Sequence, residues 1–283
     1  MTESRFVPIS RKQLSLIAEI VKSAAEEEIM PRFRNLSAAQ IETKSDPSDF
    51  VTEADKAAEI AITAGLTKAF PQAFVFGEES VAGDPTLLSK LKDADLSIII
   101  DPIDGTGNFV AERPRFGTII AVVKKGEVAA GFIYNPNSQV SHCTIRGEGS
   151  WSEAMDGKSE DLKVKKAPPL HQSHGSGGLK FLPTDLKSQI RESLKKTGSY
   201  EHAGSCAVRY PELANGELDY MFFFRLLPWD HAAGWLLHKE AGGYSHRLDN
   251  LPYRPVDFEG PLLLTSDEEQ WHELKREVFS AIG

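Results

Sequence analysis

Two aspartates follow a run of isoleucines in the middle of the chain. Ile98–Ile100 has the apolar character of a fully buried strand, and Asp101 comes directly after it. Pro102 disfavours helical dihedrals at the residue before it, so we expect Asp101 at the carboxyl end of that strand. Asp104 precedes a Gly-Thr-Gly turn whose backbone N–H groups are suited to hold an anion. The combination predicts a site where a hard divalent cation meets a phosphate group.

Three other carboxylates lie at comparable structure-breaking points. Asp49 precedes a predicted helix start, Glu78 follows a short strand predicted over 74–76, and Asp230 opens another helix. An Asx-turn is the alternative role for Asp49. Such a cluster would repel itself unless cations neutralise it, and oxygen ligands without His or Cys spacing favour Mg²⁺ or Mn²⁺. Those ions can polarise a phosphoryl oxygen and activate water, and the Thr106 hydroxyl is placed to orient that water or relay a proton.

These residues need elements that bring them together, and the sequence predicts a mixture of helices and sheets. Ser10 is a candidate cap for a first helix, and Thr52 with Asp55 resembles a capping box for a second. Residues 117–145 alternate as an antiparallel meander, whereas the second half alternates short strands with helices. The remaining predictions are a strand over 218–224 and helices over 186–194, 204–214, 228–241 and, capped by Ser266, at the carboxyl terminus. The fold class expected is a layered α+β protein.

The polar stretch 150–170 is typical of a linker between two subdomains of the chain. We therefore expect an N-terminal α+β subdomain over 1–150, with an antiparallel sheet and most metal ligands. A C-terminal α/β subdomain over 151–283 would complete the active site.

Composition narrows the class of protein. The 283 residues carry a formal net charge of −9, which disfavours a nucleic-acid-binding surface. Only two cysteines are present, which gives no disulfide framework and suits a reducing cytoplasm. No apolar run approaches the length of a transmembrane helix. A cytoplasmic, soluble protein without nucleic-acid or membrane partners is expected.

Three motifs carry a resemblance to a known family. Gly77-Glu78-Glu79-Ser80, Asp101–Phe109 and Trp229–Gly234 resemble the inositol monophosphatase family. That family belongs to the Mg²⁺-dependent, lithium-sensitive phosphatase superfamily, with fructose-1,6-bisphosphatase and the bisphosphate nucleotidases. The resemblance runs from about Leu14 to Gly243 and implies an αβαβα layered sandwich, usually a homodimer.

The resemblance also implies roles for individual residues. The implied metal ligands, for about two to three ions per site, are Glu78, Asp101, the carbonyl of Ile103, Asp104 and Asp230. The implied catalytic residues are Asp49 and Thr106, which would activate the attacking water, and Glu78. The implied supporting residues are Thr52 and Glu79. The implied substrate- or phosphate-binding residues are Asp104, Gly105, Thr106, Gly204, Ser205, Cys206 and Arg225.

The function implied is Mg²⁺-dependent hydrolysis of a small phosphate ester, with inositol monophosphate as the first candidate. Two positions depart from the family pattern: Gly107 replaces the usual Thr or Lys, and Phe223 stands where animal enzymes have a glutamate that contacts inositol. Arg225 lies nearby and could bind a second anionic group, pair with an acid of a neighbouring subunit, or simply lie exposed at a strand end. The alternatives are a 3′(2′),5′-bisphosphate nucleotidase, a histidinol-phosphatase or a sugar phosphatase, and a non-catalytic interaction protein on the same fold.

Overall fold

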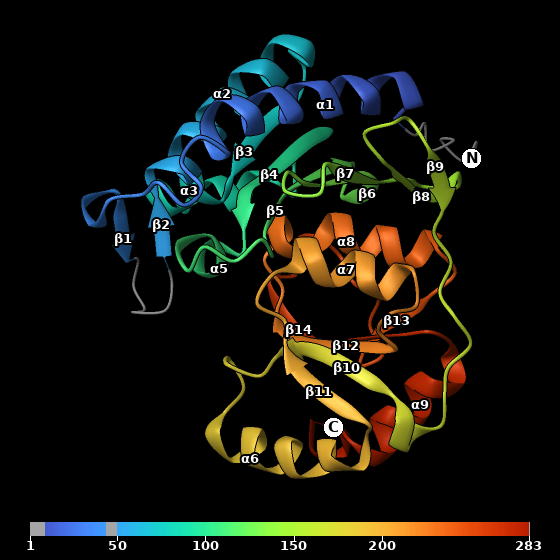
Figure 1. Cartoon of the computed structure of the whole chain (residues 1–283). Helices are drawn as coiled ribbons and strands as arrows, with labels where there is room; N and C mark the ends of the chain where they lie inside the picture. Colours follow the sequence, from blue (N-terminus) through green and yellow to red (C-terminus); the bar gives the residue numbers. More distant parts are fainter. Residues whose placement is uncertain (1–8, 44–49, 283) are drawn as a thin grey trace.

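The computed structural model describes residues 9–43 and 50–282, which form five alternating layers of helices and sheets. The described α-helices are α1 (Arg11–Ala24), α2 (Glu53–Ala69), α3 (Glu78–Gly83), α4 (Leu87–Lys90), α5 (Thr106–Val110), α6 (Thr184–Ser193), α7 (Cys206–Ala214), α8 (Pro228–Glu240) and α9 (Glu268–Glu277). Figure 1 shows α1 and α2 above one sheet, α7 and α8 between two sheets, and α6 and α9 below the second. This is the expected αβαβα sandwich.

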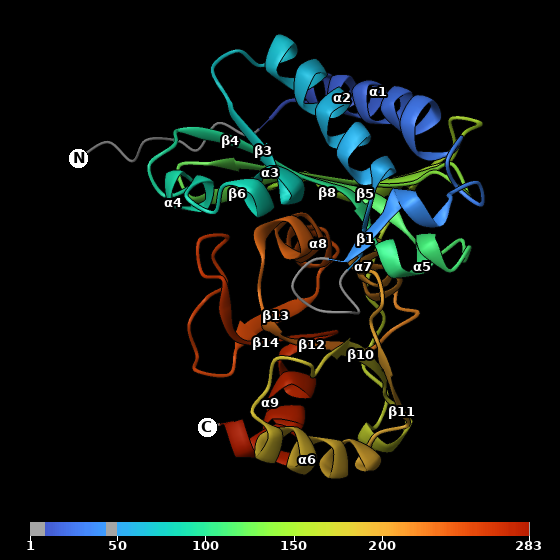
Figure 2. The ribbon, with the colours of Figure 1, turned by 90° about the vertical axis from the view of Figure 1, so that its left-hand side faces the viewer.

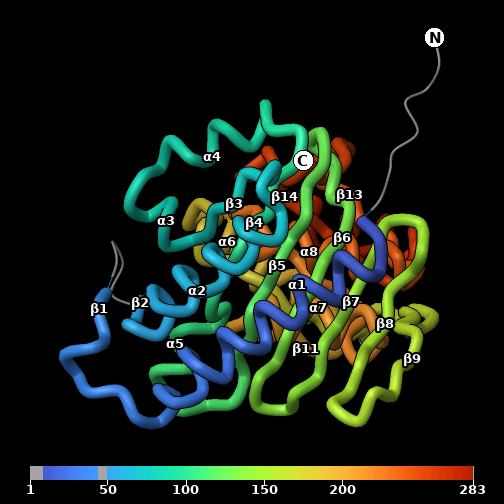
Figure 3. Tube along the Cα trace, turned by 90° about the horizontal axis from the view of Figure 1, so that it is seen from above, coloured from blue at the N-terminus to red at the C-terminus, as the bar shows by residue number. Residues whose placement is uncertain are grey.

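The outer helices α1 and α2 begin at the residues that the sequence predicts. Ser10 caps α1 and Thr52 caps α2, each within a capping box. The apolar residues of α1 recur at helical spacing and are buried, so one face of the helix packs on the sheet. Figure 3 shows α1 and α2 lying across the strands of that sheet.

The first sheet has seven strands in the order β3-β4-β5-β6-β7-β8-β9. Their bounds are β3 (Phe74–Gly77), β4 (Leu96–Asp104), β5 (Gly117–Lys124), β6 (Glu127–Asn135), β7 (Val140–Ile145), β8 (Gly149–Glu153) and β9 (Ser159–Asp161). Strands β3 and β4 are parallel and all other neighbours are antiparallel, which confirms the predicted meander. The sheet therefore continues to Asp161, past residue 150.

One expectation about β4 is wrong. The strand does not end at Asp101 but continues to Asp104, with a register shift between these residues against β5. A shift of this kind bends a strand and redirects its side chains. The bend lets both aspartates serve one site from a single strand.

The second sheet has five strands in the order β11-β10-β12-β14-β13. Their bounds are β10 (His174–Gly178), β11 (Ser199–His202), β12 (Tyr220–Arg225), β13 (Tyr244–Arg247) and β14 (Glu259–Thr265). A short pair, β1 (Ile41–Thr43) and β2 (Phe50–Thr52), is separate. Figure 2 shows α6 and α9 on the outer face of the five-stranded sheet. The cap of α9 is Asp267, not Ser266, because the Asp267 carboxylate accepts the Gln270 N–H.

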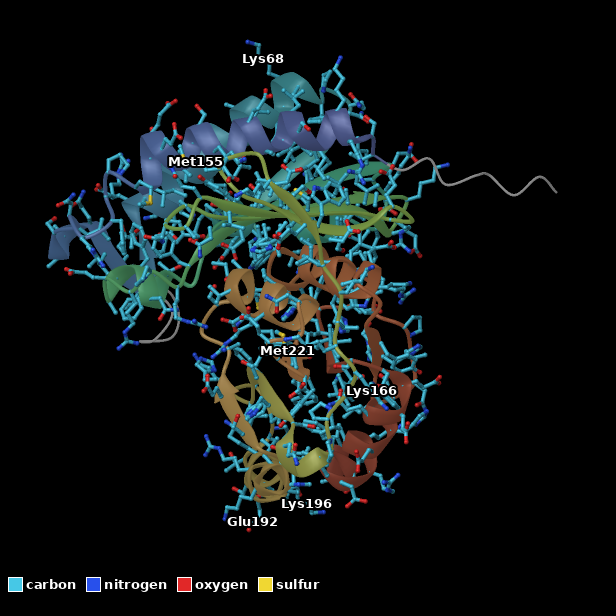
Figure 4. All side chains as sticks on the ribbon, turned by 45° about the vertical axis from the view of Figure 1, so that its right-hand side comes forward. Lys68, Met155, Lys166, Glu192, Lys196 and Met221 are labelled. Atoms are coloured by element: carbon cyan, nitrogen blue, oxygen red, sulfur yellow. The ribbon has the colours of Figure 1, made fainter. Side chains whose placement is uncertain are left out.

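The middle layer of α7 and α8 is packed by side chains from both sheets. Met221 of β12 is fully buried in this core, whereas Lys196 and Glu192 project from the edge of the molecule (Figure 4). Gly131 of β6 lies directly against α8: a Cβ there would be 3.0 Å from the Cα, Cβ and carbonyl oxygen of Ala233. The helix can therefore approach the sheet closely only because residue 131 has no side chain. None of the described helices is long and apolar enough to cross a membrane.

Gly131→Ala tests this close approach. The added methyl would force α8 away from β6, so we expect the free energy of unfolding to fall by about 1–3 kcal/mol. Chemical denaturation of the purified protein measures the change. Gly83→Ala is the matched control, because a Cβ at Gly83 would meet nothing within 4 Å. Equal stability of the two variants would contradict the packing argument.

Candidate metal-binding active site

Three carboxylates from two elements meet at one point. Asp101 and Asp104 come from the end of β4, and Asp230 lies in the first turn of α8. One carboxylate oxygen from each lies within 4.8 Å of the other two. Asp101 and Asp104 are buried, at 1% and 8% exposed. The structure thus brings together three acids that the sequence singled out as metal ligands.

The bend of β4 and the glycine that follows it position Asp104. Gly105 has a φ of 91°, a left-handed conformation that glycine adopts without strain, and it caps the short helix α5. A Cβ at Gly105 would also lie 2.9 Å from the Cβ of Ser205 and 3.0 Å from the carbonyl oxygen of Arg115. The chain can turn this sharply against the other half of the molecule only with glycine at this position.

Asp104 connects the two halves of the chain. Its Oδ2 accepts hydrogen bonds from the Ser205 hydroxyl at 2.5 Å and from the Ala207 N–H at 2.7 Å. The positive end of α7 therefore faces this carboxylate and stabilises its ionised form. Because Oδ2 makes both bonds, Oδ1 is left for a cation.

Asp101 shows the need for a cation most directly. Its Oδ1 is buried and has no hydrogen-bond partner among the described residues. An unpartnered buried carboxylate oxygen is costly, and the charges of the neighbouring acids disfavour its ionised form. A hard divalent cation bound by oxygen ligands would satisfy this atom and neutralise the cluster, so the residues present fit Mg²⁺ or Mn²⁺.

The electrostatics of the cluster agree with its geometry. Burial raises the pKa of Asp101 well above its ordinary value, and Glu78, Asp104 and Asp230 raise it further. Burial also raises the pKa of Asp104 to about 6, against the hydrogen bonds from Ser205 and the α7 backbone. The pKa of Asp230 is raised by burial and by its acidic neighbours.

Glu78 is held beside the cluster by a buried acid that the sequence analysis missed. It is the first residue of α3, directly after β3. The Glu59 carboxylate of α2 accepts the backbone N–H groups of Glu79 and Ser80, each at 2.8 Å, and so fixes the start of α3. Glu78 contributes to the raised pKa of Asp101, Asp104 and Asp230, which places it close to all three.

The carboxylate that contacts Thr106 is Asp55. The Thr106 hydroxyl lies 3.2 Å from Asp55 Oδ1 and 3.0 Å from the carbonyl oxygen of Ile103. Asp49, which the resemblance pairs with Thr106, lies outside the described residues. The capping-box pattern predicts Asp55 only as part of the helix cap, and the structure confirms that role: its Oδ2 accepts hydrogen bonds from the Thr52 N–H and hydroxyl. Burial raises the pKa of Asp55 to about 6.

A signal for Asp55 and Glu59 was present in the sequence. Both lie on the buried face of α2, one turn apart and among apolar residues. Acids are rarely fully buried without a partner, so two acids within an apolar helical stripe indicate a constrained role.

The cluster opens into a cavity of about 440 Å³. The substrate-binding residues that the resemblance implies all line it: Asp104, Gly105, Thr106, Gly204, Ser205, Cys206 and Arg225. Glu78, Ile103 and Phe223 also contribute to its wall. Thr52 and Glu79 lie behind this surface, in the capping box of α2 and the first turn of α3. The volume suits a small organic ligand.

The raised pKa values give Mg²⁺ binding a defined pH dependence. Between about pH 4 and pH 6 the folded, metal-free protein holds a proton on Asp104 that the unfolded chain has already lost, and the raised pKa values of Asp101 and Asp230 act in the same direction. Mg²⁺ must displace protons from these carboxylates. We therefore expect the stability gained from Mg²⁺ to grow as pH rises through this range, by about 1.4 kcal/mol per pH unit for each proton displaced. Denaturation with saturating Mg²⁺ and with EDTA, at several pH values, measures it.

Comparing the stability with Mg²⁺ and with EDTA at the same pH removes the contribution of the buried histidines. Burial lowers the pKa of His231 to about 3 and of His238 to about 4, so these residues add stability as pH rises whether or not Mg²⁺ is present. In Asp101→Asn the gain from Mg²⁺ should nearly vanish, while the exposed Asp93→Asn keeps it. An undiminished, pH-independent gain in Asp101→Asn would contradict the assignment.

Comparison with known proteins identifies the family of the chain. The sequence profile of the inositol monophosphatase family matches residues 11–281. The chain is 33% identical over 200 residues to the Nus factor SuhB of Escherichia coli K12, covering 69% of this chain and 71% of that protein. It is 31% identical over 204 residues to a fructose-1,6-bisphosphatase/inositol-1-monophosphatase of Thermotoga maritima, covering 72% and 73%.

Solved structures show the same fold. The inositol monophosphatase of Thermotoga maritima superposes with a TM-score of 0.78 at 26% identity, over 97% of this chain and all of that one. The SuhB protein of Bartonella henselae gives 0.77 at 25% identity, over 94% and 97%. With a profile match over almost its whole length, the chain belongs to the inositol monophosphatase family.

Proposed function

We propose that the protein is a Mg²⁺-dependent phosphatase that hydrolyses small phosphate monoesters. One observation carries the proposal: the partnerless buried oxygen of Asp101 lies in an acidic cluster beside a hydroxyl–carboxylate pair, Thr106 and Asp55. The cluster supplies cation ligands, and the pair supplies a route for a proton. Both are needed to activate water for attack on phosphorus.

Glu78, Asp101, Asp104, Asp230 and the carbonyl of Ile103 would hold about two to three Mg²⁺ ions, with Mn²⁺ as a substitute. When bound, the metal supplies Lewis acidity toward the phosphoryl oxygens and lowers the pKa of water. The family match supports Mg²⁺, and the all-oxygen donor set fits it.

Asp55 and Thr106 would manage the proton of the attacking water. The water oxygen forms a bond to phosphorus while the Thr106 hydroxyl takes its proton and passes its own to Asp55 Oδ1, 3.2 Å away. Asp55 can accept a proton near neutral pH because burial raises its pKa to about 6. The ester P–O bond breaks, the leaving alkoxide takes a proton from solvent water to depart as an alcohol, and Asp55 returns its proton to solvent.

The phosphate would rest against Gly105 and the segment from Gly204 to Cys206. Gly105 and Thr106 lie at the start of α5, and the Gly204–Cys206 segment leads into α7. The Ala207 N–H already donates a hydrogen bond to Asp104, so the phosphate would contact mainly the residues that precede α7. Asp104 would therefore both bind the cation and fix the position of the segment that contacts the phosphate.

For the substrate, inositol monophosphate is the first candidate that we propose. A relative in Thermotoga maritima, 31% identical, is named as both a fructose-1,6-bisphosphatase and an inositol-1-monophosphatase, which supports this choice. The alternatives within the same chemistry are a sugar phosphate, histidinol phosphate and a 3′(2′),5′-bisphosphate nucleotide.

A cytoplasmic homodimer is the assembly that we infer. The two cysteines, Cys143 and Cys206, are free and buried, which suits a reducing compartment. Several relatives carry the name Nus factor SuhB, which keeps a non-catalytic interaction role on this fold as a second candidate. The acidic cluster favours the enzyme, since an interaction role alone gives no reason to place three carboxylates together with two of them buried.

Activity should require both Mg²⁺ and the proton route. We expect Asp55→Asn and Thr106→Val to lower kcat on inositol 1-phosphate by about 10²- to 10⁴-fold with little change in KM, because both variants remove proton transfer. Phosphate release with Mg²⁺ and with EDTA measures the effect.

Two variants serve as controls for this experiment. Glu53→Gln changes an exposed acid in the same turn of α2 and should behave as wild type, and Thr106→Ser keeps the hydroxyl and should retain most activity. Phosphate release that survives EDTA, or full activity in Asp55→Asn, would refute the mechanism. Absence of release from every ester would favour the interaction role.

A further inference from the structure

A second cavity lies between α6 and the strands β10 and β11 of the five-stranded sheet. We propose that this cavity binds a small molecule that carries two or more adjacent phosphate groups, at a site separate from the acidic cluster. The inference does not depend on the proposed phosphatase function, because the molecule would be bound and not hydrolysed, and its binding needs no metal ion. The chemistry it requires is recognition of several negative charges by cationic side chains around one recess.

The cavity is larger than the one at the acidic cluster. Its volume is about 810 Å³, within the range of ligand pockets, against about 440 Å³ at the cluster. Figure 1 shows α6 below β10 and β11, on the face of the sheet that points away from α7 and α8. Lys180 and His202 line both cavities, and the other residues of each lining are different. A ligand beside α6 therefore occupies a space of its own.

The charge of this lining is opposite to that of the chain. Four cationic side chains line the cavity, Lys180, Lys187, Arg191 and Lys195, and no Asp or Glu of the described residues does. The chain as a whole has a formal net charge of −9. A recess lined by one sign of charge raises the local concentration of ions of the other sign. The cavity therefore attracts anions, although the net charge of the protein repels them.

The cations of the helical wall lie in successive turns. Lys187 and Arg191 belong to α6, and Lys195 lies in the 3₁₀ turn that follows it, so each is four residues from the next. Like charges at this spacing repel each other and destabilise a helix. An anion held between these side chains and the sheet would remove that repulsion.

Arg191 offers the most direct contact for a phosphate. Its guanidinium forms no ion pair or hydrogen bond with the residues that the structure describes. By contrast, the Lys195 Nζ lies 2.5 Å from the Glu192 carboxylate, and the Lys187 Nζ donates to the Lys180 carbonyl at 2.9 Å. A guanidinium can donate to two phosphate oxygens at once, which makes Arg191 suited to bind the ligand while the lysines add charge.

Tyr200 adds a hydrogen-bond donor on the sheet side of the cavity. It lines the cavity, and its hydroxyl oxygen is buried without a hydrogen-bond partner among the described residues. Burial raises the pKa of Tyr200, so the hydroxyl stays protonated. Gly177 lies against it, because a Cβ there would be 2.7 Å from the hydroxyl oxygen. A phosphate oxygen, or a water that the phosphate orders, would accept this otherwise unmade bond.

A solvated basic surface is the simpler interpretation of these side chains. Lys196 fits that description, since it projects from the edge of the molecule and does not line the cavity (Figure 4). Lys187 differs, because it is half-buried and faces a recess. The buried Leu194 and the Tyr200 ring also line this recess, so it offers an apolar wall as well as charge. This combination fits an organic phosphate better than solvent.

Titration calorimetry in EDTA tests this site apart from the metal-dependent one. Without cations the acidic cluster repels phosphate, so binding of adenosine 5′-diphosphate or of pyrophosphate would report the cavity beside α6. We expect both to bind wild type, and adenosine, which has no phosphate, not to bind. Arg191→Gln should weaken the binding of both about 10- to 100-fold, the usual loss of a charge-assisted hydrogen bond. Arg191→Lys should recover part of that loss.

The two phosphate probes distinguish the source of the ligand. Tighter binding of adenosine 5′-diphosphate would support an organic phosphate whose carbon frame contacts Leu194 and Tyr200. Equal affinity for both would support the site with an inorganic polyphosphate as its ligand. Lys12→Gln is the control, because it removes one exposed charge from α1, in the opposite outer layer, and should leave both affinities unchanged.

Three results would overturn the proposal. The first is no binding of either probe to wild type, or equal affinity of wild type and Arg191→Gln. The second is an affinity that changes in Asp101→Asn and not in Arg191→Gln, which would place the probes at the acidic cluster. The third is a dimer, measured by analytical ultracentrifugation, that dissociates in Arg191→Gln while wild type binds no probe, which would make the cavity part of an interface between copies of the chain.

Discussion

The repulsion among Asp101, Asp104 and Asp230 is the constraint on which the rest of the structure depends. Three carboxylates within 4.8 Å of one another, two of them buried, make the folded chain less stable unless something positive joins them. The fold meets part of this demand itself, through the α7 N–H and the Ser205 hydroxyl at Asp104. It leaves Asp101 Oδ1 without a hydrogen-bond partner among the described residues, and a bound cation would satisfy this atom.

The layered architecture follows from the need to bring these acids together from distant parts of the chain. Asp101 and Asp104 come from the first sheet, and Asp230 from the middle helix layer, so the site exists only where these layers meet. Two glycines make the contact close enough: Gly131 lets α8 lie on β6, and Gly105 turns the chain against Ser205. Asp104 then joins the two halves directly. A substitution at the layer interface should therefore alter the geometry of the acidic cluster even when the substituted residue contacts none of the three aspartates.

Much of the fold could be predicted because its signals are local. The helix caps at Ser10 and Thr52 and the alternating meander from residue 117 depend on neighbouring residues alone, and the structure has them. The bend of β4 after Asp101 depends on pairing with β5, and the choice of Asp267 over Ser266 as a cap depends on how the chain enters α9. Neither feature can be predicted from neighbouring residues alone. The same holds for the site: the acids at the strand ends could be predicted from the local sequence, but the Asp55–Thr106 contact could not, because it joins residues 51 positions apart.

The proposed chemistry requires a divalent cation bound by Asp101, Asp104 and Asp230. The most direct measurement is a crystal structure of the protein soaked in Mn²⁺, with anomalous scattering recorded at the manganese edge. We expect at least one strong anomalous peak within bonding distance of Asp101 Oδ1 and of carboxylate oxygens from Asp104 or Asp230. Ordered carboxylates with no anomalous peak between them, in crystals soaked at a saturating concentration of Mn²⁺, would contradict the central claim.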